Sequence, residues 1–138
     1  MKVDLNIGLV VAGGDNSPTA VTERAVEAVR LMAESTLFGR VRSRIEYVAY
    51  EDPTGKPVTE ATLITTAVCR DRLPSIRHLI HYLAGRLGQD CIAARFEDDG
   101  RVIAEDLIGP GADAWGAFNP DFFVDYEAVA DATERRAA

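Results

Sequence analysis

Four stretches of the chain alternate apolar and polar residues or concentrate β-branched ones, and they predict strands. Residues 3–11 alternate with period two, as a half-buried strand does. Residues 41–50 alternate in the same way, and residues 59–69 are rich in β-branched side chains. The turn Asp52-Pro53-Thr54-Gly55 joins these two stretches into a predicted hairpin. Residues 91–97 predict a fourth strand.

Two intervening stretches repeat their apolar residues at helical spacing. Ser17 and Pro18 predict the N-cap and the first residue of a helix. Its apolar positions are Val21, Ala25, Val26, Val29, Met32 and Ala33. Pro74 opens a second predicted helix and Gly88 closes it. The apolar stripe of this helix consists of Ile76, Leu79, Ile80, Leu83 and Leu87.

The predicted order, β-α-β-β-α-β, defines an α+β fold of split-βαβ, ferredoxin-like type. Such a fold has an antiparallel sheet with two helices on one face. A tight turn at residues 98–100 and a short strand at 101–104 add a small β-hairpin extension to this core, which spans residues 1–108. Residues 109–138 form an aromatic and acidic C-terminal extension. Asn119-Pro120-Asp121 begins a predicted amphipathic C-terminal helix there.

Composition narrows the class of protein. A chain of 138 residues, 47% hydrophobic and 27% charged, has the size and balance of one globular domain. The net charge of −7 belongs to the last third, because residues 1–89 hold 11 basic and 10 acidic side chains, whereas residues 90–138 hold 4 and 12. Cys69 and Cys91 lie in apolar runs, which predicts buried thiols in a reducing compartment. The start of the chain lacks a signal-peptide core, and no run reaches membrane length, so we expect a cytoplasmic protein without a membrane partner.

The sequence carries no strong catalytic or cofactor motif. The loop at residues 13–17 joins a strand to a helix but lacks G-x-G-x-x-G spacing and a lysine, so we predict no cofactor. His78 and His81 project opposite the apolar stripe of the second helix, and we interpret them as surface residues without a metal. The predicted central strands, residues 3–11 and 60–70, hold no aromatic residue on which a base could stack. Nucleic acid is therefore not an expected partner.

Five of the ten aromatic residues fall within twelve positions of the acidic C-terminal segment. Aromatic anchors ringed by charge are typical of binding hot spots, and equally of a helix packed across its own sheet. Three arginines share one face of the predicted edge strand, where charge discourages edge-to-edge pairing and where an acidic partner could bind. The candidate binding residues are Trp115, Phe118, Phe122, Phe123, Tyr126, Arg40, Arg42 and Arg44.

Two functions from different classes follow. The favoured one is a small non-enzymatic protein-binding domain, regulatory, inhibitory or assembly-related, that binds a protein partner or itself as a homodimer. The alternative is a small cofactor-free enzyme on a dimeric ferredoxin-like (α+β barrel) scaffold, with Tyr47, Tyr50, His78 or Trp115 converging on a pocket. A pocket with a titratable group near its floor favours the enzyme, whereas a flat aromatic patch favours the binding domain.

Overall fold

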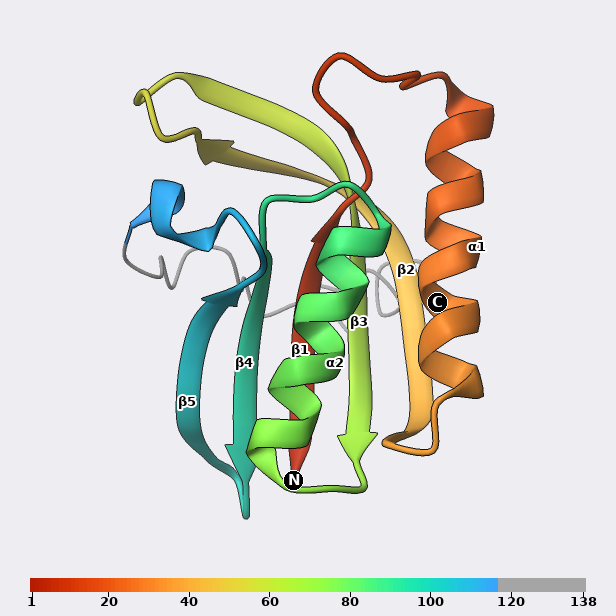
Figure 1. Cartoon of the computed structure of the whole chain (residues 1–138), viewed down its shortest axis with the longest axis vertical. Helices are drawn as coiled ribbons and strands as arrows, with labels where there is room; N and C mark the ends of the chain where they lie inside the picture. The colour runs from red at the N-terminus through yellow and green to blue at the C-terminus, as the bar shows by residue number, and fades with distance from the viewer. Residues whose placement is uncertain (117–138) are drawn as a thin grey trace, which may run out of the picture.

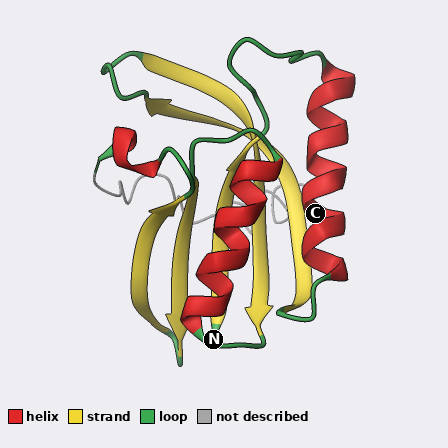
Figure 2. Ribbon diagram, viewed as in Figure 1, coloured by secondary structure: helices red, strands yellow, loops and turns green. Residues whose placement is uncertain are grey.

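A five-stranded antiparallel sheet and two helices make up the fold, as a computed structural model that describes residues 1–116 shows (Figures 1 and 2). The strands stand in the order β2-β3-β1-β4-β5. This arrangement confirms the predicted α+β class. The elements are β1 (Lys2–Gly8), α1 (Pro18–Glu34), β2 (Phe38–Glu51), β3 (Pro57–Cys69), α2 (Leu73–Arg86), β4 (Ile92–Asp98), β5 (Arg101–Ile108) and the short 3₁₀ helix η1 (Ala112–Trp115).

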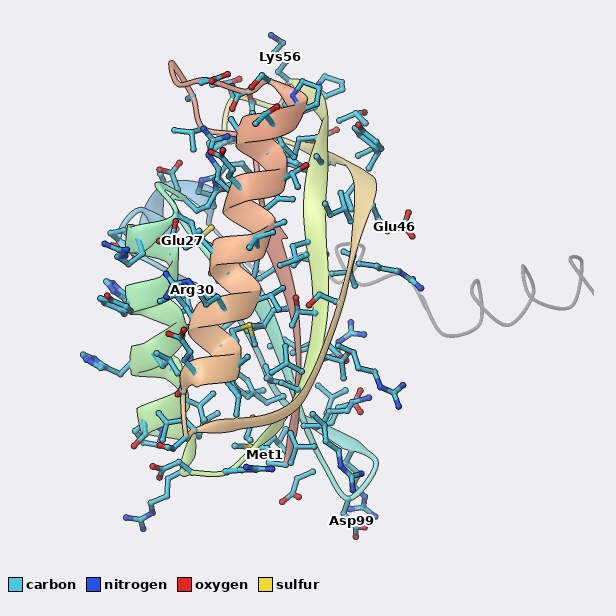
Figure 3. The ribbon with its side chains drawn as sticks, turned by 90° about the vertical axis from the view of Figure 1, so that its right-hand side faces the viewer. Met1, Glu27, Arg30, Glu46, Lys56 and Asp99 are labelled. Atoms are coloured by element: carbon cyan, nitrogen blue, oxygen red, sulfur yellow. The ribbon has the colours of Figure 1, made fainter. Side chains whose placement is uncertain are left out.

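Both helices lie on the same side of the sheet, as Figure 3 shows. Alternate residues of the central strand β1, Leu5 and Ile7 among them, point to this side and are fully buried. The core between sheet and helices also contains Ala28, Met32, Leu63, Ile76, Ile80, Leu83, Ile92 and Phe96. The predicted stripe of α2 packs on the strand residues of this face. In α1 the prediction holds for Ala25 and Met32, whereas Val26 is 61% exposed because it lies on the side of the helix that is turned away from the sheet.

The predicted start of α1 and the predicted end of α2 are confirmed, and α2 begins at Leu73, one residue before the predicted Pro74. The Ser17 hydroxyl accepts a hydrogen bond from the Ala20 amide at 3.2 Å and caps α1, with Pro18 in the first turn. Gly88 follows the end of α2 with φ of 66°, a left-handed conformation that glycine adopts without strain. The turn between β2 and β3 also forms as predicted, because the Gly55 amide donates to the Asp52 carbonyl at 2.9 Å.

Strand β5 differs from the short returning strand that the sequence predicts. It continues to Ile108 and pairs with β4 along its whole length. The acids Glu105 and Asp106, which resemble turn residues in the sequence, are paired instead. Glu105 lies 3.5 Å from the Arg95 guanidinium of the neighbouring strand, and Asp106 accepts from Arg77 of α2 at 2.5 Å. These partners keep the acids within a fifth strand.

Strand β2 stands at the edge of the sheet, as predicted for the arginine-bearing strand. Arg42 and Arg44 pair in register with Thr66 and Ile64 of β3 and lie on the face opposite the helices. Arg40 lies in a β-bulge between Gly39 and Arg42 and has a φ of 49°, so it departs from the regular alternation.

Two further predictions concern membrane-spanning segments and the C-terminal helix. Among residues 1–116, no helix combines the length and apolar character needed to cross a membrane. The predicted C-terminal helix, with Phe118, Phe122, Phe123 and Tyr126, lies outside the described residues.

Candidate active site

A cavity of about 250 Å³ lies where β1 ends and the β2–β3 hairpin curls past the sheet. Its volume is close to the lower end of the range typical for small-molecule sites. Strands β1 to β5 all supply part of its floor from the face opposite the helices, and the loop after β1, the segment after α2 and η1 supply its walls. The lining residues are Asn6, Gly8, Val10, Ala12, Val48, Tyr50, Glu60, Thr62, Gly88, Gln89, Asp90, Cys91, Ala93, Leu107 and Trp115.

A carboxylate and a phenol meet in this cavity. Glu60 on β3 and Tyr50 on β2 lie on the same face, because Val48, two residues before Tyr50, pairs with Glu60. The Tyr50 hydroxyl donates a hydrogen bond to the Glu60 carboxylate. Burial raises the pKa of Glu60, and the Tyr50 hydrogen bond offsets part of that increase. Burial and the neighbouring Glu60 charge both raise the pKa of Tyr50, so the phenol stays a proton donor.

A second carboxylate positions the single tryptophan of the chain. The Trp115 indole Nε1–H donates to Asp90 Oδ2 at 3.0 Å. The indole also contacts Tyr50, with ring centroids 5.6 Å apart and planes inclined at 50°. The short helix η1 therefore presents an aromatic ring to the cavity, and Asp90 sets the orientation of that ring.

Glycines allow the chain to approach the cavity this closely. A Cβ on Gly109 would lie 2.4 Å from the Asp90 carbonyl oxygen, so only glycine lets the segment before η1 pass over Asp90. A Cβ on Gly8 would lie 2.4 Å from Gln89 Oε1 and 2.8 Å from Glu60 Oε1. The missing side chain of Gly8 thus leaves the space in which the two polar side chains converge.

The cavity has no activated thiol. Cys91 lines it, but burial and the adjacent Asp90 raise the pKa of this thiol to about 11, so little thiolate exists at neutral pH. The cavity instead places the carboxylate of Glu60 beside the aromatic rings of Tyr50 and Trp115, within a partly apolar lining. Carboxylates and aromatic faces both attract organic cations. The cavity therefore suits a small cationic ligand.

The structure brings together some of the residues that the sequence singled out and separates the others. Tyr50 and Trp115 line the cavity, as the enzyme alternative required. Tyr47 is 79% exposed and His78 lies on the exposed face of α2, so neither takes part. Arg40, Arg42 and Arg44 do not line the cavity. The other proposed aromatic residues lie beyond residue 116.

Glu60, Asp90 and Gln89 were not predicted as site residues. Glu60 had one usable feature, since it is the only charged residue in the β-branched stretch 59–69 and its position places it on the face away from the helices. Asp90 and Gln89 follow a helix end, where polar residues are ordinary, and nothing in their local pattern sets them apart.

Comparison with known proteins identifies a shared fold. No family model and no curated protein matches the chain. Two solved structures do: a phage SAM lyase in complex with S-methyl-5'-thioadenosine, with a TM-score of 0.60, and a phage SAM lyase in the apo state, with a TM-score of 0.57. Each is 14% identical to this chain and is matched over 78% of it, which corresponds to 87% and 86% of the respective lyase chains. At this identity the likeness concerns the fold.

These findings correct the favoured prediction of a non-enzymatic protein-binding domain. The similar structures are those of an enzyme. In addition, the described residues form a pocket that contains a titratable group, Glu60, where a binding domain was expected to show a flat aromatic patch. The prediction went wrong because the acidic, aromatic C-terminal segment was weighed as an interaction surface, whereas Trp115 at its start folds back onto Asp90.

Proposed function

We propose that this chain is an enzyme that cleaves a sulfonium compound of the S-adenosylmethionine type in the cavity between β1, the β2–β3 hairpin and η1. The observation that carries the proposal is the convergence of Glu60, Tyr50 and Trp115 in one small pocket. The strand order and the helices on one face support the ferredoxin-like arrangement predicted from the sequence. A fold shared with a phage SAM lyase adds support to this substrate class.

The chemistry of the substrate matches the lining of the pocket. A sulfonium amino acid carries positive charge on sulfur and on its ammonium group. Glu60 supplies a negative charge, and the faces of Tyr50 and Trp115 supply the π-electron density that attracts cations. An adenine ring can stack on the same indole, since stacking on aromatic side chains is a general way to hold a base. The apolar side of the cavity, with Val10, Val48 and Leu107, suits the methyl group.

The proposed reaction breaks the bond between sulfur and the four-carbon amino-acid fragment. The bonding electrons leave with sulfur, which becomes the neutral thioether of S-methyl-5'-thioadenosine. Without water as a reactant, the four-carbon fragment can complete its valence in two ways. It can lose a β-proton, which passes to solvent, or it can close a ring through its own carboxylate, which releases no proton. Both routes balance in atoms and charge. In both, Glu60 faces the cationic substrate, and no step uses Cys91.

The direct test is to incubate the purified chain with S-adenosylmethionine and to measure S-methyl-5'-thioadenosine by chromatography. We expect turnover by the wild type and a loss of about 100-fold or more in kcat/KM for Glu60→Gln, because one preorganised electrostatic contact contributes on that scale. Glu51→Gln is the matched control, since Glu51 is exposed on the same hairpin and does not line the cavity. No product from the wild type, or equal activity of the Glu60→Gln variant, would overturn the proposal.

Self-association is a separate proposal carried over from the sequence. The cavity is lined by residues of one chain, so a dimer is not needed to describe it. The face of the sheet opposite the helices carries half-buried strand residues such as Asp4 and Thr66, which hydrogen-bond to each other at 2.8 Å. Light scattering at micromolar concentration should give a mass above 15.0 kDa, and a species of 15.0 kDa alone counts against association.

A further inference from the structure

The loop that follows β1 forms one wall of the cavity and is held by side chains from three different parts of the chain. Residues 9–16 connect β1 to the N-cap of α1, and Val10 and Ala12 of this loop line the cavity (Figure 1). Gly13 and Gly14 stand exposed at the turn of the loop, with φ of 73° at Gly13. A loop of this composition has many accessible conformations unless its backbone is tied down.

Arg24 of α1 provides the largest share of these ties. Its guanidinium donates to the Leu9 carbonyl at 2.8 Å, to Asn16 Oδ1 at 3.1 Å, and to the Asp15 carbonyl. The two carbonyls lie at opposite ends of the loop. The planar fork of one arginine therefore joins both ends of the loop to the helix at once, through two separate nitrogens, whereas a lysine would have to reach both carbonyls from one ammonium nitrogen.

Two further side chains complete the set. Asn16 closes the loop across its own backbone, because its Oδ1 accepts from the Val11 amide at 2.8 Å and its Nδ2 donates to the Val11 carbonyl at 3.0 Å. Gln89, from the segment after α2, donates to the Val10 carbonyl at 2.9 Å. Gln89 also lies against Gly8 beside Glu60, so the loop is joined directly to the polar side of the cavity.

We infer that Arg24 is a positioning residue for the cavity: its guanidinium holds residues 9–16 in the conformation that places Val10 and Ala12 against a bound ligand. This inference rests on the proposed function for the identity of the ligand. Arg24 does not line the cavity, so it acts through the loop and touches no substrate. Its effect is to make the binding-competent conformation the dominant one before the ligand arrives.

This role predicts a particular division between binding and turnover. Without the guanidinium, the loop samples other conformations. The apparent affinity for the ligand is then reduced in proportion to the fraction of molecules whose loop keeps the binding-competent conformation. If one tenth remains, the KM for S-adenosylmethionine and the Kd for S-methyl-5'-thioadenosine each rise about tenfold. At saturation the ligand itself selects the competent conformation, so kcat changes less than about twofold.

The experiment compares Arg24→Ala, Arg24→Lys and the control Arg30→Ala with the wild type. Arg30 lies on the same helix, is exposed, and pairs with Glu34 at 3.2 Å. Kinetics are measured with S-adenosylmethionine, and binding of S-methyl-5'-thioadenosine is followed by the fluorescence of Trp115, the single tryptophan. Hydrogen exchange of the amides of residues 9–16 is measured without ligand, at a temperature well below the melting point of every variant.

We expect Arg24→Ala to exchange faster in residues 9–16 and to show the tenfold rise in KM and Kd with kcat nearly unchanged. Arg24→Lys should fall between this variant and the wild type, and Arg30→Ala should match the wild type. Unchanged exchange in Arg24→Ala overturns the inference, as does faster exchange with unchanged KM and Kd, or a fall in kcat alone. If the wild type neither cleaves nor binds these compounds, the proposed function fails, while the exchange rates still decide whether Arg24 holds the loop.

Discussion

The two faces of the sheet differ in what they bury, although the same strands form both. On the helix side, Leu5 and Ile7 of β1 are fully buried among apolar neighbours. On the opposite side, the alternate residues of the same strand are Asp4, Asn6 and Gly8, and this side leads into the cavity. The comparison shows that successive residues of one strand serve different purposes. Those that point to the helices stabilise the core, and those that point to the other face lead to the candidate active site.

The largest expected effect lies on the helix side. Leu5→Ala removes a fully buried side chain from the centre of the core, and such changes cost about 2–5 kcal/mol of unfolding free energy. Urea unfolding should show this loss. At a temperature where the variant stays folded, its KM for S-adenosylmethionine should remain close to that of the wild type. A change in KM as large as the change in stability would contradict the division between the two faces.

On the opposite side, Glu60→Gln should raise stability while it lowers activity. Because burial raises the pKa of Glu60 in the folded chain, the folded state binds this proton more readily than the unfolded state. The ionised form is thus disfavoured by folding, and stability falls as pH rises from the ordinary value of 4.5 through the raised pKa. Glutamine removes this penalty and retains an oxygen that accepts from Tyr50.

Urea unfolding of the wild type and of the Glu60→Gln variant across a pH series measures the difference in their unfolding free energies. The variant should be the more stable one at neutral pH, and its advantage should shrink as pH falls toward 4.5. Burial also raises the pKa of Asp4, but this carboxyl is present in both proteins and cancels in the comparison. A variant that is less stable than the wild type at pH 7 would show that Glu60 contributes structural support instead.

A smaller effect is expected for Gly8→Ala. The φ of Gly8 is not left-handed, so alanine suits the backbone, and the new Cβ meets only the flexible ends of Gln89 and Glu60. Stability should change by less than about 1 kcal/mol, whereas displacement of two cavity side chains should lower kcat/KM about tenfold, since small misplacements in a site reduce rates strongly. Thermal melting and steady-state kinetics on the same sample check both halves.

The smallest effect belongs to the outer surface of α2. The double variant His78→Ala/His81→Ala should keep its unfolding free energy within about 0.5 kcal/mol and its activity unchanged, because both side chains face solvent away from the cavity. Thermal melting and product formation measure this. A loss of activity would mean that the helix side also carries chemistry, and the two faces would then not be divided as described.

The elements of this fold could be predicted because each depends on residues close together in the chain. The apolar stripe around Ile76 and Ile80, the Ser17 cap and the turn at Asp52 are local patterns, and burial acts on them through periods of 3.6 and 2. Strand β5 was predicted too short because Glu105 and Asp106 acquire their partners from Arg95 and Arg77, which no local pattern reveals.

The sequence by itself determined the class of fold, the Ser17 cap of α1 and the buried stripe of α2. Only the tertiary structure decided that Tyr50, Glu60, Asp90 and Trp115 share a cavity, because they come from two strands, a segment after a helix and a 3₁₀ helix. Their convergence depends on the register of β3 between β1 and β2, the curl of the hairpin, and the close passage of Gly109 over Asp90. Contacts between residues that are far apart in the sequence are set by the packing of the whole chain. The periodicity of apolar residues indicates only which side of a helix or strand is buried.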